Sequence, residues 1–308
     1  MSTALESSHD MKTSFHLVAG TLACLCIFAA QGQTLEKIKK DGAITLGYRD
    51  AAGPFSYLDD KQQPIGYSMD ICMKIVDAVK AELKMPALKV NLNAVGPATR
   101  IPLISNGTVD LECGVSTNNA ERQKQVAFAP TTFVTATRLM YKKTLSVEAL
   151  GDLKGKTLAS PSGSSNMRRV TELNTAQQLG INLAGVQDLP EAFLMVETGR
   201  AAALATDDVI IYNMVANSKA PGDYAVSKFQ LSVEPYGIML RRGDPAFKKV
   251  VDDAVIGLFK SGEIDKLYAK WFTSPVPPKN INLNMPMSAA LKRAIAKPTD
   301  SPEPKDYE

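Results

Sequence analysis

The stretch Leu111–Gln125 carries residues suited to holding a small anion. An apolar run, Val109–Cys113, stops at Gly114 and is followed by a hydroxyl-rich turn and a polar segment, a pattern that predicts strand, loop and helix. Backbone N–H groups and the positive end of the helix dipole would then favour an anion beyond the strand's carboxyl end. Thr117 and Arg122 can both reach such an anion, and arginine can hold a carboxylate through two hydrogen bonds.

Two further arginines lie where ligand-binding side chains are expected. Arg49 follows the predicted strand Ala43–Gly47 by two residues, and α/β sheets bind their ligands at the carboxyl ends of strands. Arg100 stands at the start of a predicted helix that Thr99 can cap, where its charge opposes the helix dipole. A cation in this position needs an anionic partner, which favours a role in binding over an ordinary solvated position.

The second half of the chain offers a hydroxyl group and a carboxylate. Ser165 lies in a turn between the predicted strand Thr157–Ala159 and a helix, so it can bind an anion or serve as a plain N-cap. Asp207 follows the predicted strand Ala201–Ala205 and can pair with a ligand ammonium or cap the next helix. The residues alone leave these alternatives open.

The order of these segments predicts an α/β protein with two lobes that face one cleft. In each half a helix ends at a glycine, Gly107 or Gly199, and is followed by a short strand and polar groups. We expect the strands Thr132–Met140 and Tyr236–Arg241 to cross between the lobes. The predicted division is a first lobe of residues 33–136 and 233–275, a second lobe of residues 137–232, and a C-terminal tail of residues 276–308 that wraps the surface and frays at its acidic end.

Composition indicates a globular protein, and the N-terminal segment indicates export. The chain has 308 residues, 45% of them hydrophobic, and a formal net charge of +3, which is too small to indicate nucleic acid as a partner. Residues 1–32 have the pattern of a secretory signal peptide, in which Met11 and Lys12 precede an apolar run, and either Met1 or Met11 can be the true start.

Removal of the signal peptide would take away both histidines, His9 and His16. The mature chain would then lack the imidazole that Ser-His-Asp and Cys-His catalysis and the usual zinc sites require. We therefore predict no catalytic residues, no metal site and no cofactor. Of the cysteines, Cys72 and Cys113 would remain, either paired or as free buried thiols.

Several motifs carry a resemblance to a known family. They are Gly47–Asp50 with Pro54–Tyr57, Gly66–Asp70, Arg100–Leu103 with Asn106-Gly107, Glu112–Gly114 with Thr117–Lys124, and Pro277–Asn280. Over essentially the whole mature chain these motifs resemble the periplasmic glutamate/aspartate-binding proteins of ABC importers, within solute-binding protein family 3. The resemblance implies the type II periplasmic binding fold, in which each lobe is a mixed sheet flanked by helices and a two-strand hinge closes the lobes around one amino acid.

The resemblance also implies roles for the residues that would hold the α-substituents of the ligand. Arg122, Thr117 and Ser165 would bind the α-carboxylate. Asp207 and the backbone carbonyl of Val115 would bind the α-ammonium.

Arg49 and Arg100 would bind the side-chain carboxylate of the ligand. Together with Arg122 and Asp207 they match a ligand with two carboxylates and one ammonium, whereas a neutral amino acid would leave a buried cation unpaired. Pro97 and Leu189 stand where glutamate binders have a pocket serine and a pocket histidine. An acidic ligand is therefore predicted, as glutamate, aspartate or a related dicarboxylate.

The predicted function is that of a monomeric periplasmic receptor that captures an acidic amino acid and delivers it to an inner-membrane ABC permease. The alternative is an enzyme on the same fold, such as a periplasmic dehydratase acting on a carboxylated substrate, because fold alone does not decide activity. Against an enzyme stand the missing histidines and the lack of a carboxylate with an evident reason for a raised pKa.

Overall fold

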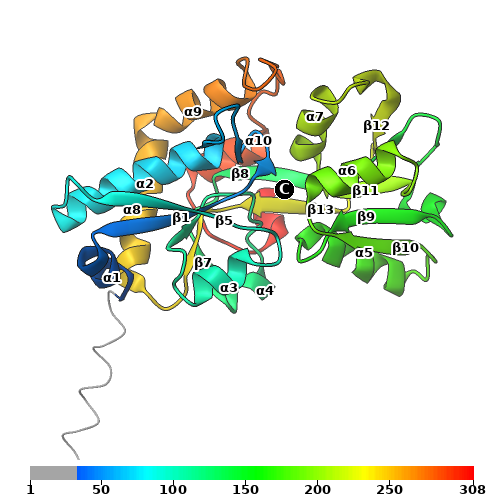
Figure 1. Cartoon of the computed structure of the whole chain (residues 1–308). Coiled ribbons are helices and arrows are strands. Elements are labelled where there is room, and N and C mark those ends of the chain that lie inside the picture. Colours follow the sequence, from blue (N-terminus) through cyan, green and yellow to red (C-terminus); the bar gives the residue numbers. More distant parts are fainter. Residues whose placement is uncertain (1–32) are drawn as a thin grey trace, which may run out of the picture.

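Two lobes connected by a pair of antiparallel strands make up the computed structural model, which describes residues 33–308 (Figure 1). The predicted signal peptide, residues 1–32, lies outside the described residues. Each lobe is a mixed sheet flanked by helices, which confirms the predicted type II periplasmic binding fold. Within residues 33–308, no helix is long and apolar enough to cross a membrane.

The first lobe contains a five-stranded sheet and most of the helices. Its main strands are β1 (Ala43–Tyr48), β5 (Lys89–Ala94), β6 (Leu111–Glu112), β7 (Val126–Phe128) and β14 (Met239–Arg241), in the order β5-β1-β6-β14-β7. β1 is parallel to β5 and β6, whereas β14 is antiparallel to β6 and β7. The helices are α1 (Gln33–Asp41), α2 (Tyr67–Leu83), α3 (Arg100–Ser105), α4 (Ala120–Gln123), α8 (Pro245–Ser261) and α9 (Glu263–Phe272), and a small sheet contains β2 (Ala51–Ala52), β3 (Ser56–Leu58) and β4 (Pro64–Ile65).

The second lobe is built in the same way around a six-stranded sheet. Its strands are β8 (Phe133–Lys142), β9 (Thr157–Pro161), β10 (Asn182–Val186), β11 (Ala203–Asp207), β12 (Tyr224–Val226) and β13 (Ser232–Tyr236), in the order β10-β9-β11-β8-β12, with β13 also paired to β8. Its helices are α5 (Ser165–Ala176), α6 (Leu189–Glu197) and α7 (Asp208–Ala216), with 3₁₀ turns at Leu150–Leu153 and Pro221–Asp223.

Helix α2 illustrates how the sequence pattern produces the packing. Ile71, Ile75 and Val79 recur at the spacing of one helical face and are fully buried. The helix packs on α8 and ends at Lys84, which takes a left-handed conformation ahead of Pro86.

The hinge consists of β8 and β13, which pair from Phe133 opposite Tyr236 to Thr137 opposite Ser232. The predicted crossing strand Tyr236–Arg241 is wrong, because β13 ends at Tyr236 and β14 joins the sheet of the first lobe. Gly237 lies between the two strands, where a Cβ atom would come 2.9 Å from the carbonyl oxygen of Ala129. The chain changes sheets at this close approach, which an uninterrupted apolar pattern does not reveal.

Aromatic side chains hold the first-lobe end of the hinge. The ring of Phe133 lies 4.8 Å from that of Phe55, 4.9 Å from that of Phe272 and 6.1 Å from that of Tyr236, measured between centroids. All four residues are buried. Such edge and stacked contacts stabilise this end of both hinge strands beyond the area that they bury.

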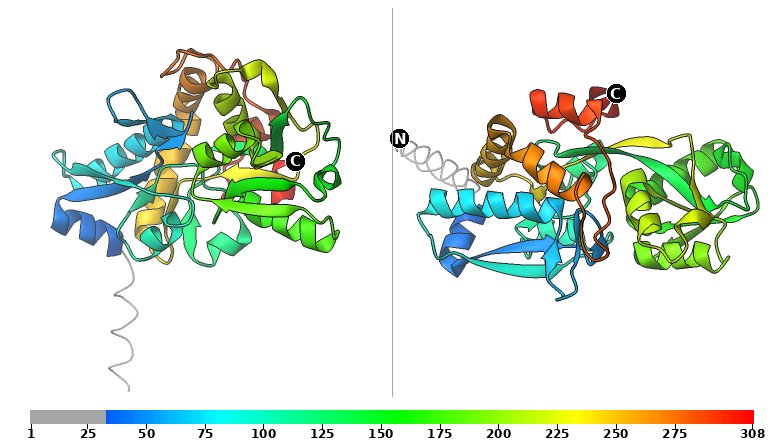
Figure 2. Two further views of the ribbon diagram at one scale, coloured as in Figure 1. Left: turned by 45° about the vertical axis from the view of Figure 1, so that its right-hand side comes forward. Right: turned by 90° about the horizontal axis from the view of Figure 1, so that it is seen from above.

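The C-terminal tail contains α10 (Ala289–Ala296) and a 3₁₀ turn, Pro304–Tyr307, and it lies beside the hinge strands (Figure 2). The expectation that its acidic end frays is wrong. Tyr307 is buried, and its hydroxyl group is 2.8 Å from that of Thr131. The carbonyl of Asp300 accepts a hydrogen bond from the Asn118 side chain. A buried aromatic ring and these hydrogen bonds offset the entropy that usually frees a chain end.

Cys72 and Cys113 form a disulfide between α2 and the end of β6, which resolves the alternative left open by the sequence. The bond and the adjacent hydrogen bond from the Ser68 hydroxyl to the Gly114 carbonyl tie the segment after β6 to the start of α2.

Replacing both cysteines by alanine should lower the free energy of unfolding of residues 33–308 by about 2–4 kcal/mol, because the bond restricts the unfolded chain. Urea denaturation without reductant measures the difference. Reductant should destabilise the parent protein by a similar amount and leave the double variant unchanged. Equal stability of the oxidised and reduced parent protein would contradict the prediction.

Candidate binding site between the lobes

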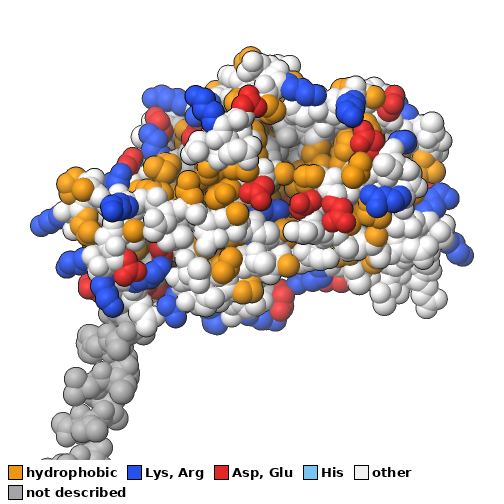
Figure 3. Space-filling view, viewed as in Figure 1, with side chains coloured by type: hydrophobic (Ala, Val, Ile, Leu, Met, Phe, Trp, Pro, Cys, Tyr) orange, Lys and Arg blue, Asp and Glu red, His pale blue; other side chains and the backbone are white. Residues whose placement is uncertain are grey.

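A cavity lies between the lobes, at the carboxyl ends of β1, β6, β9 and β11, and Figure 3 shows the surface hollowed between the lobes. Its volume of about 20 Å³ is roughly that of one water-sized sphere, so a molecule the size of an amino acid requires the lobes to separate. The cavity is lined by Arg49, Pro97, Arg100, Val115, Pro161, Ser164, Ser165, Asn166, Leu189, Thr206, Asp207 and Ile210.

The seven residues predicted for the site lie in this region of the structure. Arg49, Arg100, Val115, Ser165 and Asp207 line the cavity itself. Thr117 and Arg122 are not part of the lining but are buried beside it and contact the facing lobe.

Arg49 is buried, with 5% of its surface exposed, directly after β1. Its backbone N–H donates to the Ser56 hydroxyl at 2.9 Å, which fixes the turn into β2. Burial, followed by repulsion from Arg100, lowers the pKa of Arg49 to about 10, and Glu112 opposes this shift.

Arg100 begins α3 and directs its guanidinium group toward the loop after β6. Nη1 donates to the Val115 carbonyl at 2.9 Å and to the Ser116 hydroxyl at 2.8 Å, and it lies 4.0 Å from Glu112 Oε1. Nε of Arg100 has no hydrogen-bond partner within the described part of the chain. The predicted cap does not form as expected, because the Thr99 side chain bonds to Gly96 instead of to the helix.

Arg122 lies on α4, whose N-cap is Asn119. Its Nη1 donates to the Thr117 carbonyl at 2.9 Å, and its Nη2 donates across the cleft to the Gly163 carbonyl at 3.4 Å. Burial, followed by repulsion from Arg100, lowers the pKa of Arg122 to about 9. Since α4 has only four residues, the expected helix dipole is small, and the charge of Arg122 itself is the main attraction for an anion.

The sequence left two roles open for Ser165, N-capping of a helix and binding of an anion, and in the structure the N-cap is Ser164 instead. Ser164 is the N-cap of α5, since its hydroxyl accepts a hydrogen bond from the Met167 backbone at 3.0 Å. The hydroxyl of Ser165 instead lies 3.1 Å from that of Thr117, on the opposite lobe. These two hydroxyl groups therefore meet where the lobes touch.

Asp207 is likewise free of capping, because its side chain makes no cap hydrogen bond to α7. Oδ1 accepts a hydrogen bond from Asn166 Nδ2 at 2.7 Å, and Oδ2 accepts one from the Tyr236 hydroxyl. Burial and then Glu234 raise the pKa of Asp207 to about 7, although both hydrogen bonds oppose the shift. The expectation that no carboxylate has a reason for a raised pKa is therefore wrong.

Sequence reasoning missed four polar residues around the site. They are Glu112, Asn166, Glu234 and Tyr236, all of them buried. Tyr236 and Glu234 lie on a hinge strand and Glu112 lies in β6, where an alternating or apolar pattern indicates packing rather than contact with a charge. Asn166 follows the serine turn and could have been noticed there. In residues 33–308, no group of three or more His, Cys, Asp or Glu side chains is placed to hold a metal ion.

The chain is similar to known proteins of one family. The profile of the bacterial extracellular solute-binding proteins, family 3, matches residues 44–274. An L-glutamate/L-aspartate-binding protein of Pseudomonas aeruginosa is 49% identical over 92% of this chain and 94% of its own length. A glutamate/aspartate import solute-binding protein of Escherichia coli is 41% identical over 88% and 90%. The solved structure of an ancestral arginine-binding protein bound to arginine has a TM-score of 0.68 and 26% identity, covering 75% of this chain and 98% of its own.

Tyr236→Phe should lower the free energy of unfolding by about 1–3 kcal/mol, because a buried oxygen of Asp207 loses its donor. The same change should raise the pKa of Asp207, since the hydroxyl favours the ionised carboxylate. Urea denaturation and NMR titration of Asp207 measure the two effects. Tyr212→Phe, at a partly exposed ring, is the matched control and should change neither quantity. An unchanged Asp207 titration in Tyr236→Phe would contradict the prediction.

Proposed function

This chain belongs to family 3 of the bacterial extracellular solute-binding proteins, and from that membership and the cleft we propose that it captures an acidic amino acid for an ABC importer. The curated relatives that match most of the chain are named as glutamate/aspartate-binding or import proteins, not as enzymes. We therefore favour a non-enzymatic receptor over a dehydratase on the same fold.

One observation carries this proposal. Arg49, Arg100 and Arg122 are each at most 6% exposed, and they lie with Asp207 around a single cleft. Repulsion between buried cations is costly unless anions compensate it. A small zwitterion would supply two carboxylates to the three guanidinium groups and one ammonium to Asp207, while the buried carboxylate of Glu112 already lies beside Arg100.

The proposed contacts to the α-substituents come from both lobes. Arg122, Thr117 and Ser165 bind the α-carboxylate, and the meeting of the last two hydroxyl groups at 3.1 Å supports this placement. Asp207 binds the α-ammonium together with the carbonyl oxygen of Val115. That carbonyl already accepts a hydrogen bond from Arg100, but its second lone pair remains able to accept another.

The proposed contacts to the ligand's side chain come from Arg49 and Arg100. The neighbouring walls include two apolar side chains, because Pro97 and Leu189 line the cavity. Neither side chain can donate a hydrogen bond, so the second carboxylate depends on the two guanidinium groups. The ligand class is thus an acidic amino acid or a related dicarboxylate.

Closure of the lobes is proposed to accompany binding. We divide the chain into a first lobe of residues 33–136 and 233–275, a second lobe of residues 137–232 and a tail of residues 276–308. Gly163 of the second lobe approaches the first so closely that a Cβ atom would lie 2.9 Å from the Cα of Ala98. Since the ligand's contacts are divided between the lobes, the ligand favours lobes closed around it, at the wider spacing that its own volume requires, over lobes that are fully open.

The cellular setting is part of the same proposal. Residues 1–32 are proposed to act as a signal peptide that exports the chain to the periplasm. There the protein would act as a monomer and present its ligand to an inner-membrane ABC permease.

A thermal-shift screen of residues 33–308 tests the proposal, because a ligand that binds only the folded state raises the melting temperature. Glutamate, aspartate or both should raise it, whereas lysine and leucine should not. Arg122→Ala should abolish every shift, and Arg100→Ala should most weaken ligands with a second carboxylate. Arg200→Ala, at an exposed arginine, is the control and should behave like the parent protein. Stabilisation by lysine instead of by acidic compounds would overturn the proposal.

The affinity for an acidic amino acid should rise with pH up to about 7, because the α-ammonium pairs with ionised Asp207. Below that pH the dissociation constant should increase by up to roughly tenfold per unit, with proton release on binding. Because the pKa of Asp207 is higher in the folded protein than in the unfolded chain, its protonation stabilises the unliganded folded state. This contribution to the free energy of unfolding is fully present below about pH 4 and is lost as the pH rises through about 7.

Isothermal titration calorimetry between pH 6 and pH 8 in two buffers measures both affinity and proton release. Glutarate, which has no ammonium group, is the control ligand, and its affinity should not rise with pH. An amino-acid affinity that is independent of pH in this range would show that Asp207 does not receive the ammonium.

A further inference from the structure

Glu112 is a buried carboxylate next to the cleft whose role is not explained by the contacts proposed for the ligand. Its side chain has no exposed surface, and Arg100, itself 3% exposed, lies 4.0 Å away. Oε2 accepts a hydrogen bond from the Ser116 hydroxyl, while Oε1 has no hydrogen-bond partner within residues 33–308. A buried charge with incomplete hydrogen bonding is costly, so its partners must be the nearby cations.

Ser116 connects this carboxylate to Arg100. Its hydroxyl accepts from Arg100 Nη1 at 2.8 Å and donates to Glu112, so the three groups form a chain of hydrogen bonds. Arg100 Nη1 is thereby directed at the loop after β6, while Nε of Arg100 is buried without a hydrogen-bond partner in residues 33–308.

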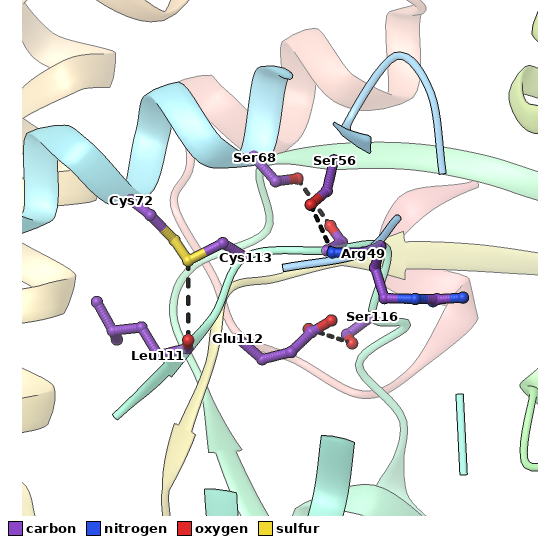
Figure 4. The surroundings of a disulfide bond; sticks show 9 residues. Arg49, Ser56, Ser68, Cys72, Leu111, Glu112, Cys113 and Ser116 are labelled. Atoms are coloured by element: carbon purple, nitrogen blue, oxygen red, sulfur yellow. Dashed lines mark hydrogen bonds between the residues drawn. A yellow bond between two sulfur atoms is a disulfide. The ribbon is translucent and has the colours of Figure 1, made fainter. Parts of the chain in front are cut away.

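The backbone around Glu112 holds the carboxylate in this place. Glu112 pairs with Gly47 of β1 and Met239 of β14, and Cys113 is bound to α2 by the disulfide (Figure 4). Gly114 has no side chain, and the space is filled by the carboxylate of Glu112 and the aliphatic part of Arg49. A Cβ atom at position 114 would overlap Glu112 and lie 2.8 Å from Arg49 Cγ.

The charge of Glu112 acts on more than one arginine. It favours the charged forms of Arg49 and Arg122, and so raises the pKa of each against the effect of burial. Asp207 and Glu234 are the other carboxylates near Arg122. Glu112 thus lowers the positive potential at a ligand bound between these arginines.

We propose that Glu112 is a selectivity residue: it limits the positive charge of the cleft, so that an acidic amino acid with one net negative charge is preferred to a dicarboxylate with two. A negative potential acts on each ligand in proportion to its net charge, and it therefore penalises the dicarboxylate more. At an effective dielectric constant of about 20, one charge several Å away changes such a preference by roughly tenfold or more. The inference rests on the proposed binding function and specifies the ligand within that class.

Calorimetric dissociation constants of glutamate, aspartate, glutarate and succinate test the proposal in the parent protein and in Glu112→Gln. The ratio of dicarboxylate to amino-acid dissociation constants should fall by roughly tenfold or more in the variant, through tighter binding of the dicarboxylates relative to the amino acids. Glu112→Asp keeps the charge and should retain most of the parental ratio. A purely structural role would weaken both ligand classes equally and leave the ratio unchanged.

Glu121→Gln is the matched control, because it removes a carboxylate from the exposed side of α4 and should not alter the ratio. If Glu112→Gln does not fold, Glu112→Met, of similar volume and without unpaired polar atoms, decides the matter by the same ratio. An unchanged ratio in the folded variant overturns the proposal. Failure of the parent protein to bind any acidic amino acid would instead overturn the proposed function.

Discussion

Three guanidinium groups buried around one cleft repel one another, and much of the surrounding structure compensates for this repulsion. Burial, followed by repulsion from Arg100, lowers the pKa of both Arg49 and Arg122. The carbonyls of Val115, Thr117 and Gly163 accept hydrogen bonds from Arg100 or Arg122. The buried carboxylate of Glu112 lies 4.0 Å from Arg100. The compensation is incomplete, because Arg100 Nε lacks a partner among residues 33–308. Anionic groups of a ligand therefore find a region where positive charge is already assembled.

The same region is connected to the hinge by direct hydrogen bonds. Asn118 N donates to the Pro235 carbonyl at 2.7 Å, and Thr117 forms a β-bridge with Tyr236, so the loop after β6 lies against β13. Tyr236 also donates to Asp207 at the other side of the cleft. A ligand that contacts Asp207 and Thr117 thus acts on groups bonded to a hinge strand. In the proposed function, closure and binding share these contacts, which is the condition for thermodynamic coupling.

Much of the fold and of the candidate site was predictable from local pattern. The buried face of α2 follows from the helical spacing of Ile71, Ile75 and Val79, and the two-lobed organisation follows from repeated helix–strand units. Arg49 and Asp207 were recognisable because each stands at the carboxyl end of a buried strand. The break at Gly237 was not recognisable, since it depends on a close approach to Ala129.

The sequence by itself determined the types of charged residue and the elements that carry them, because side-chain chemistry and helix or strand periodicity are local properties. Only the tertiary structure decided which groups face each other: Cys72 with Cys113, Tyr236 with Asp207, and Ser165, not Ser164, with Thr117. It also placed Glu112 beside Arg100. These pairs join segments that are brought together by the packing of sheets, helices and lobes. A local sequence pattern does not predict that packing.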